Sequence, residues 1–248
     1  MHLFVSDIHF GRFALDQERE TERDLIRCLR SVSREVEVLY LVGDVFEHYI
    51  EYRHLIPKGF LRFQALLAEW TDAGVPVKYF AGNHDPWHRD YFEKELGVEV
   101  ILDAAVIKID GETAYVTHGD GLEDGTSLYA KLKPVLRHPL PVGIFTGLLP
   151  ADAGLAIAKW YGRTFRHNGI NARRVADLRA AALAILAKEE TGLIILGHSH
   201  KPELLDTGHG IYLNPGCWYA DRTVAIIDNG KASLKQWNGE CLQPYPEP

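Results

Sequence analysis

The sequence has little cysteine and no pairing pattern among the cysteines it has. Its three cysteines, Cys28, Cys217 and Cys241, are widely spaced and include no Cys-x-x-Cys motif. This spacing argues against a disulfide framework and against a structural zinc site. It is typical of reduced thiols in a cytoplasmic protein.

The sequence also lacks long apolar runs. No run reaches the ~18 uninterrupted apolar residues that a membrane-spanning helix requires. Strand-like sequence begins at Leu3, with no basic segment and apolar segment before it, so we expect no signal peptide. These absences predict a cytoplasmic protein that is soluble or attached to a membrane surface.

Positive charge is scarce as well, because the formal net charge is −7 at pH 7. We expect no nucleic-acid partner, since the molecule has no overall positive field to attract a polyanion. The sequence has no internal repeat or low-complexity tract, and 46% of its 248 residues are hydrophobic. A chain of this size and composition can bury a full core, and we expect a single domain over residues 1–248.

Short apolar runs alternate with helical patterns in the first third of the chain. The runs of strand length are Leu3–Val5, Val38–Val42 and Val77–Ala81. Helical periodicity lies between them, including the segment Lys58–Ala73, and this order predicts βαβ units in a parallel sheet. Later, Asp110-Gly111 and Asn229-Gly230 are typical of tight hairpin turns between antiparallel strands. We therefore predict an α/β fold with mixed sheets.

Residues from about 125 to 171 interrupt this rhythm. They combine basic residues with an apolar stretch over 141–149 and the aromatic pair Trp160-Tyr161. We predict an insertion here, followed by a helix over Val175–Lys188 that leads back to the core. The apolar residues of the insertion fit lipid contact and ordinary helix packing equally well, and both interpretations stay open.

The most informative feature is a set of five short clusters of acidic, amide or histidine residues, each at the end of an apolar run. The clusters are Val5-Ser6-Asp7-Ile8-His9, Gly43-Asp44, Gly82-Asn83-His84-Asp85, Thr117-His118-Gly119-Asp120 and Gly197-His198-Ser199-His200. A buried strand that ends in a polar side chain delivers that group to one edge of a sheet, where open α/β sheets bind their ligands. We expect the five clusters to converge on one site.

These residue types are suited to divalent metal ions, because carboxylate and amide oxygens and neutral imidazoles bind manganese, iron or zinc. Two ions roughly 3.5–4 Å apart polarise a phosphoryl group, lower the pKa of a bridging water and stabilise the departing oxygen. Each cluster alone is weak, because Asp and Asn commonly begin turns and a lone histidine is often only packed. The ordered set of five predicts a two-metal site that hydrolyses phosphate esters or anhydrides.

The ordered set resembles the calcineurin-like metallophosphoesterase superfamily. The superfamily pattern D-x-H, G-D, G-N-H-[DE], H and G-H-x-H occurs here in order across nearly the whole chain. The resemblance implies a four-layer α/β sandwich of two mixed β-sheets flanked by helices, with two metal ions bridged by Asp44. It places Asp7, His9, Asp44 and His200 around one ion, and Asp44, Asn83, His118 and His198 around the other.

The same resemblance implies catalytic roles for two residues besides Asp44. His84 is expected to face the scissile phosphate without binding metal, where it stabilises developing charge or protonates the leaving oxygen. Glu47 lies three residues after Asp44, where phosphatases of the superfamily often carry an Asp that orients this histidine. We expect Glu47 to orient His84 in the same way.

Within the superfamily, the chain resembles the UDP-2,3-diacylglucosamine pyrophosphatase family of lipid A synthesis. The opening D-x-H, the run Gly43-Asp44-Val45-Phe46-Glu47 and the run His118-Gly119-Asp120-Gly121-Leu122 carry this resemblance. It implies attack at the α-phosphorus, which releases UMP and 2,3-diacylglucosamine 1-phosphate (lipid X). It also implies a cofactor of two manganese ions, with Fe²⁺ or Zn²⁺ as alternatives.

In that family, a helical cap shelters the acyl chains and helps to attach the enzyme to the cytoplasmic face of the inner membrane. The predicted insertion at 125–171 occupies the place of this cap. The residues that we expect to contact the lipid-linked nucleotide are Asn83, His84, Asp120, Arg163 and Arg166. No protein partner is predicted.

One position departs from that family, because many of its members have Arg where this chain has His84. A histidine can donate a proton, whereas an Arg stays charged. One alternative is therefore a metallophosphoesterase that acts on nucleotides or on other soluble phosphodiesters or monoesters. A second, non-enzymatic alternative is a phosphoesterase-like interaction scaffold, which the complete set of seven ligand positions argues against.

Overall fold

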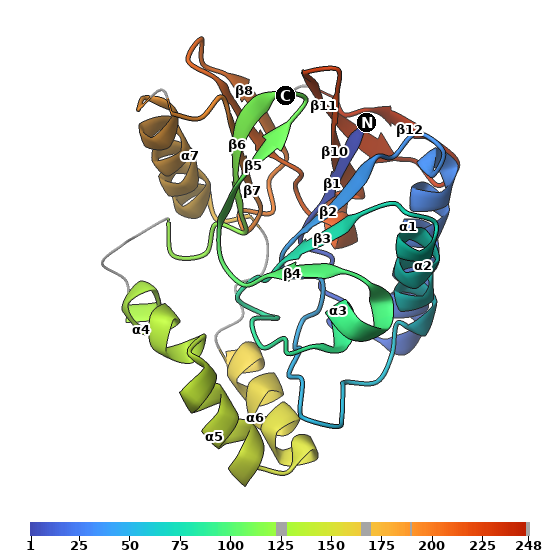
Figure 1. Cartoon of the computed structure of the whole chain (residues 1–248), viewed down its shortest axis with the longest axis vertical. Helices are drawn as coiled ribbons and strands as arrows, with labels where there is room; N and C mark the ends of the chain where they lie inside the picture. The colour runs from blue at the N-terminus through green and yellow to red at the C-terminus, as the bar shows by residue number, and fades with distance from the viewer. Residues whose placement is uncertain (123–127, 165–169, 189, 247–248) are drawn as a thin grey trace.

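The computed structural model describes residues 1–122, 128–164, 170–188 and 190–246 (Figure 1). Two β-sheets pack face to face, and helices cover the outer face of each sheet. The predicted α/β fold with two mixed sheets and flanking helices is therefore confirmed.

The first sheet has seven strands. In spatial order they are β12 (Leu242–Pro244), β11 (Lys231–Trp237), β10 (Thr223–Asp228), β1 (His2–Val5), β2 (Val38–Val42), β3 (Val77–Phe80) and β4 (Glu99–Ile101). The strands β1 to β4 are parallel, and β10 to β12 pair antiparallel. The parallel half places the ends of β1, β2 and β3 at one edge of the sheet.

The second sheet has five strands. Their order is β5 (Ala105–Ile109), β6 (Glu112–Thr117), β7 (Leu193–Leu196), β9 (Ile211–Asn214) and β8 (Glu203–Asp206). The hairpin between β5 and β6 turns at Asp110 and Gly111, which have φ values of 50° and 89°. Two residues with positive φ match the twist of the flanking strands, as the sequence predicted for this turn. Strand β8 was not predicted, because most of its side chains are exposed and show no alternation.

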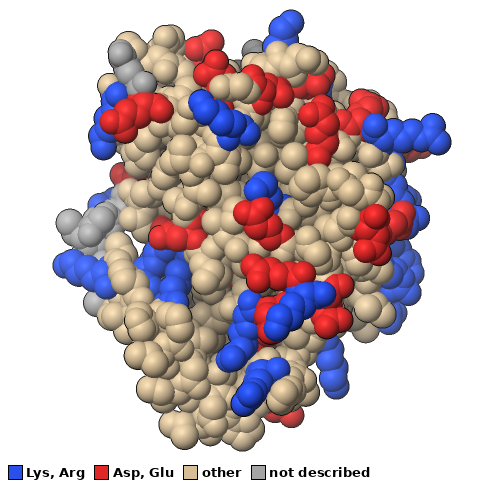
Figure 2. Space-filling model, in the orientation of Figure 1, with Lys and Arg blue, Asp and Glu red and all other residues tan. Residues whose placement is uncertain are grey.

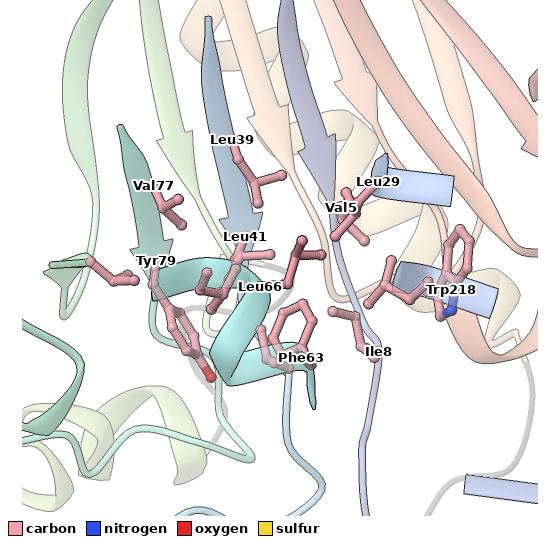
Figure 3. Packing of buried hydrophobic residues seen from close by; sticks show 14 of the residues in the cluster. Val5, Ile8, Leu29, Leu39, Leu41, Phe63, Leu66, Val77, Tyr79 and Trp218 are labelled. Carbon is pink, nitrogen blue, oxygen red and sulfur yellow. The ribbon is translucent and has the colours of Figure 1, made fainter. Parts of the chain in front are cut away.

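Three helices cover the outer face of the seven-stranded sheet. They are α1 (Leu15–Val32), α2 (Leu61–Asp72) and α3 (Tyr91–Leu96). The short α8 (Trp218–Asp221) contacts α1, because the Trp218 indole N–H donates to the Thr21 carbonyl. In Figure 3, Leu29 of α1 and Phe63 and Leu66 of α2 face the strand residues Leu41 and Val5. The other face of the same strands packs on the second sheet through residues such as Phe4 and Val42. Strands buried on both faces explain why their sequences are continuously apolar.

Two helix boundaries differ from the prediction. Helix α2 begins at Leu61 rather than near Lys58, because Phe60 adopts a left-handed φ of 53° that a helix cannot continue. Helix α7 (Ala172–Leu186), which covers the second sheet, begins earlier than predicted. Its start is fixed by Asn171, whose side-chain oxygen accepts hydrogen bonds from two main-chain N–H groups of the first turn.

The region of the predicted insertion forms three helices, α4 (Leu128–Leu136), α5 (Pro139–Leu148) and α6 (Ala151–Thr164), which we call the cap. The cap extends away from the sheets at the bottom of Figure 1. It contacts the core through Trp87, whose indole N–H donates to the Leu136 carbonyl and whose ring packs on Phe145. No single described helix is long and apolar enough to cross a membrane; α5 and α6 meet the criterion only as a pair, bent by 117°.

Candidate metal centre

The loops that follow five strands bring the five sequence clusters to one place. Asp7 follows β1, Asp44 follows β2, Asn83 follows β3, His118 follows β6 and His198 follows β7. The first three strands belong to one sheet and the last two belong to the other. The site therefore lies where the two sheets meet, and neither sheet alone contains it.

The backbone at the site is strained. Five predicted ligands have left-handed φ values between 50° and 65°, namely Asp7, His9, Asp44, His198 and His200. Such conformations cost on the order of 1–3 kcal/mol each and persist where the surroundings over-determine them. Three glycines allow the loops to approach so closely: a Cβ at Gly43 would lie 2.3 Å from His118 Nδ1, one at Gly82 2.1 Å from Asp44 Oδ1, and one at Gly197 2.2 Å from Ser6 Oγ.

One group of possible ligand atoms comes from Asp7, His9 and His200, all within 4.8 Å of one another. Asp7 Oδ1 lies 3.2 Å from His200 Nε2 and 3.6 Å from His9 Nε2. The two Nε2 atoms lie 3.3 Å apart. The other oxygen of Asp7 accepts hydrogen bonds from Ser6 Oγ at 2.6 Å and from the His198 N–H at 3.0 Å, which fixes the carboxylate.

A second group comes from Asp44, His118 and His198, again within 4.8 Å of one another. His118 Nε2 lies 3.2 Å from Asp44 Oδ2. The same Asp44 oxygen lies 3.7 Å from His9 Nε2, which belongs to the first group. Asp44 therefore stands between the two groups, where a bridging carboxylate would have to be.

Unsatisfied buried atoms test whether this site fits metal ions. Asp7 Oδ1, Asn83 Oδ1 and His118 Nε2 are buried and have no hydrogen-bond partner within the described part of the chain. Buried polar atoms without a partner are costly, so native proteins satisfy them with protein, water or an ion. These three atoms are an oxygen of a carboxylate, an oxygen of an amide and a nitrogen of an imidazole, which are the donors that Mn²⁺, Fe²⁺ and Zn²⁺ accept. The donor set fits a pair of divalent cations.

Hydrogen bonds hold two of the histidines with their Nε2 atoms toward this space. His9 Nδ1 donates to Glu47 Oε2 at 2.9 Å, and His118 Nδ1 donates to the Val42 carbonyl at 2.8 Å. Both acceptors are oxygen atoms that carry no hydrogen, so the Nδ1 atoms must be protonated. The Nε2 lone pairs are then available to an ion, which is the usual arrangement of histidine ligands in metal sites.

The protonation equilibria show strong attraction between the acidic and basic groups. Burial opposes ionisation of Asp7, but the nearby charge of His200 outweighs burial and lowers the pKa of Asp7. Burial also opposes protonation of His9, yet the nearby carboxylate of Asp7 and the hydrogen bond to Glu47 raise the pKa of His9 to about 9. Without a cation, the carboxylate of Asp7 stays ionised and His9 carries the compensating proton, which metal binding must displace.

His84 lies beside the two groups. Its Nδ1 is 3.1 Å from the main-chain carbonyl of Glu47, and its ring packs against His9 with ring centroids 4.8 Å apart. Its main-chain N–H donates to Asp44 Oδ1 at 2.8 Å. Possible ligand atoms of His84, His9 and Asp44 lie within 4.8 Å of one another, so His84 borders the site.

Glu47 is placed differently from the prediction. Its carboxylate hydrogen-bonds His9 and lies 3.3 Å from an Arg12 nitrogen, whereas its main-chain carbonyl contacts His84. Burial opposes its ionisation, but the hydrogen bond of His9 outweighs burial and lowers the pKa of Glu47 to about 2. Glu47 therefore orients a predicted metal ligand with its side chain and His84 with its backbone.

The structure describes the three other predicted substrate contacts, Asp120, Arg163 and Arg166, to different extents. Asp120 is buried, and its Oδ2 lies 2.9 Å from an Arg137 nitrogen and 3.3 Å from Lys133 Nζ. Its carboxylate thus binds two residues that lie in or directly after α4. Arg163 lies near the end of α6, where only the main chain is described, and Arg166 lies outside the described residues.

Asp85 holds the metal loops together, a role that the sequence analysis missed. Its buried carboxylate accepts hydrogen bonds from the N–H groups of Asp44 (3.2 Å), Val45 (2.7 Å), Phe46 (3.2 Å) and Gly82 (2.7 Å) and from the Tyr79 hydroxyl. Burial and the nearby charge of Asp44 raise the pKa of Asp85. The signal was present, because an acidic residue ends the G-N-H-[DE] pattern.

The family model of calcineurin-like phosphoesterases matches residues 3–202, which include all five clusters. The chain belongs to this family, so the resemblance drawn from the clusters is confirmed. It is a metal-dependent phosphoester hydrolase, since the family match coincides with the groups of metal-binding side chains described above.

Individual proteins of known name are also similar to this chain. A UDP-2,3-diacylglucosamine hydrolase of Porphyromonas gingivalis is 35% identical over 157 residues, which cover 62% of this chain and 59% of that relative's length. A UDP-2,3-diacylglucosamine hydrolase of Aeromonas salmonicida is 28% identical over 98% of this chain and 95% of its own length. Among solved structures, the Yfce phosphoesterase of E. coli aligns with a TM-score of 0.49 at 16% identity, covering 97% of this chain and 95% of that one.

Proposed function

We propose that the protein hydrolyses the pyrophosphate of UDP-2,3-diacylglucosamine at the α-phosphorus, giving UMP and 2,3-diacylglucosamine 1-phosphate. The observation that carries the proposal is the convergence of the ligand loops beside a cap whose helix α5 has no buried residue. Relatives that bear the name of this activity match this chain over most of its length.

The cofactor in this proposal is a pair of divalent ions, with Mn²⁺ preferred over Fe²⁺ and Zn²⁺. Asp7, His9 and His200 would hold one ion, Asn83, His118 and His198 the other, and Asp44 both. Such a pair supplies Lewis acidity at the phosphoryl group and makes water nucleophilic at neutral pH.

His84 acts on the leaving side of the reaction in this proposal. Its Nδ1–H is held by the Glu47 carbonyl, so its position is fixed by main-chain atoms. A histidine placed there donates a hydrogen bond or a proton to the oxygen that departs with the lipid phosphate. The buried neighbours His9 and Asp44 keep this donor within reach of the reacting groups.

The cap supplies the contact with lipid. Leu140, Ile144 and Leu148 are spaced by four residues, so they lie on one stripe of α5, and 69%, 62% and 79% of their surfaces are exposed. The part of the surface over α5 that faces the viewer in Figure 2 is largely uncharged. An exposed apolar stripe of this kind fits acyl chains and the cytoplasmic surface of the inner membrane, so we propose a peripheral membrane enzyme. We propose no nucleic-acid or protein partner.

A second candidate is hydrolysis of nucleotides or of small phosphodiesters, and His84 favours it. A histidine at this position permits a leaving group that needs protonation, which a permanently charged Arg would serve less well. In this case, the cap would serve only as a lid.

An assay of the purified protein with UDP-2,3-diacylglucosamine and Mn²⁺ tests the proposal. We expect UMP and 2,3-diacylglucosamine 1-phosphate in equal amounts, and loss of turnover when the ions are chelated. Brisk hydrolysis of a short phosphodiester without release of UMP from the lipid substrate would contradict the proposal and favour the second candidate.

A further inference from the structure

Arg137 directly follows α4 in the cap, yet its side chain points into the core. Only 10% of this side chain is exposed. Arginine side chains are rarely buried without several acceptors, because removing a guanidinium from water is expensive. The groups that surround Arg137 therefore indicate what the residue does.

The guanidinium binds main-chain carbonyls of the core. One terminal nitrogen lies 3.0 Å from the Gly82 carbonyl and 3.4 Å from the Ala81 carbonyl, and the other contacts the Leu102 carbonyl. Gly82 directly precedes Asn83, and a Cβ at Gly82 would lie 2.1 Å from Asp44 Oδ1. Arg137 therefore binds the main chain directly before Asn83, the predicted amide ligand of the metal site.

The same guanidinium also binds the loop after β6. Its Nη2 lies 2.9 Å from Asp120 Oδ2, and Asp120 comes two residues after His118. Arg137 therefore connects the Asn83 loop with the His118 loop. These loops come from different sheets, and both serve the same ion in the proposed site.

We propose that Arg137 is a positioning residue that holds Asn83 and His118 at the distance required by the second metal ion. The proposal rests on the two-metal site of the proposed function but not on the identity of the substrate. Removal of the Arg137 guanidinium frees the two loops that carry Asn83 and His118, ligands of one ion. It leaves the ligands Asp7, His9 and His200 of the other ion untouched. The two ions should therefore respond differently.

The test is titration of Mn²⁺ into metal-free protein by calorimetry, for the unaltered protein and for Arg137→Met, Arg137→Lys and Lys131→Met. Lys131→Met is the matched control, because Lys131 is an exposed residue of α4, the helix that Arg137 directly follows. In Arg137→Met, we expect one ion to bind as in the unaltered protein and the other ten- to a hundredfold more weakly, as is typical when the partners of ligands are removed. For Arg137→Lys, we expect a smaller loss, because a lysine pairs with Asp120 but cannot span the carbonyls as a planar fork.

A second measurement separates positioning from simple attachment of the cap. With bis(p-nitrophenyl) phosphate, a small phosphodiester without acyl chains, we expect kcat to fall in Arg137→Met while KM changes little. If Arg137→Met binds each of the two ions as tightly as the unaltered protein does, the proposal is overturned. The same holds if Lys131→Met loses as much metal affinity as Arg137→Met. If Arg137→Met does not fold, Arg137→Lys decides the matter by the same criterion. Binding of fewer than two ions by the unaltered protein would instead contradict the two-metal site itself.

Discussion

At the residue scale, the roles of Asp44 and His84 are separable although the two residues touch. Asp44 is fully enclosed between the two ligand groups, whereas His84 lies at their border and keeps part of its surface exposed. Asp44 places a charged oxygen close to nitrogens of both His9 and His118. Removing each side chain should therefore affect different properties of the site.

We expect Asp44→Ala to abolish both metal binding and turnover, because the carboxylate that lies close to histidines of both groups is lost. We expect His84→Ala to keep both ions and to lower kcat by roughly 10²–10⁴-fold, the usual contribution of a positioned acid or base. Metal content by mass spectrometry and kcat on the same preparations check both outcomes. Unchanged turnover in His84→Ala would remove this residue from the reaction.

At the element scale, buried carboxylates fasten loops and helix starts to the core. Glu51 accepts hydrogen bonds from the N–H groups of Arg89, Asp90 and Tyr91, all near 2.9 Å, at the start of α3. Glu22 of α1 does the same for Arg62 and Phe63 of α2, at 3.1 Å. Anionic side chains at helix N-termini satisfy free N–H groups and the helix dipole. These two carboxylates thus fasten the start of α3 to the segment after β2 and the start of α2 to α1.

The attachment of α3 should depend on pH through His88. This ring stacks on Tyr49 with centroids 4.5 Å apart and contacts Phe92 of α3 at 5.2 Å. Burial lowers the pKa of His88 from 6.5 to about 3. As the pH falls, His88 is therefore protonated in the unfolded chain before it is protonated in the folded one. The stabilisation of the fold by the neutral His88 ring is fully present above pH 6.5 and is lost as the pH falls toward 3.

Replacement of His88 by Phe should remove this dependence. Between pH 8 and pH 5, the free energy of unfolding of the unaltered protein should fall by about 2 kcal/mol more than that of His88→Phe. The difference grows by ~1.4 kcal/mol for each pH unit over which His88 is protonated in the unfolded chain but not in the folded one. Urea denaturation of metal-free protein at the two pH values measures the difference. His54→Phe, at an exposed histidine, is the control and should behave as the unaltered protein does. Parallel losses in all three proteins would contradict this role of His88.

Strand ends and motif order were predictable because they are local. The apolar runs before Asp7, Asp44 and Asn83 indicate buried parallel strands, and such strands deliver their ends to one edge. The contacts of Glu47 and Asp120 were not predictable, because His9 lies 38 residues from Glu47 and Arg137 lies 17 residues from Asp120. Side-chain pairing over such separations depends on how the cap and the two sheets pack, which periodicity does not encode.

At the scale of the whole molecule, the cap joins two surfaces of opposite character. Through Arg137 and Lys133, the α4 region makes buried polar contacts with the metal loops. Helix α5, farther from the core, has no buried residue. Contact of the stripe of Leu140, Ile144 and Leu148 with water is unfavourable by roughly 25 cal/mol per Å² of apolar surface. An apolar partner that covers the stripe would remove this unfavourable free energy. A membrane surface fits this partner, because the lipid substrate of the proposed function would also reach the site from there.

We expect the triple variant Leu140→Ser, Ile144→Ser and Leu148→Ser to partition at least tenfold less to vesicles of phosphatidylethanolamine and phosphatidylglycerol. Its metal content and its turnover of bis(p-nitrophenyl) phosphate should not change, because α5 has no buried residue. The matched control is Leu61→Ser with Val106→Ser, which removes apolar residues that are 73% and 65% exposed but lie outside the cap. Sedimentation with the vesicles measures the partition. Equal partitioning of the two variants would reject α5 as the membrane contact, because general loss of exposed apolar surface would then explain the result.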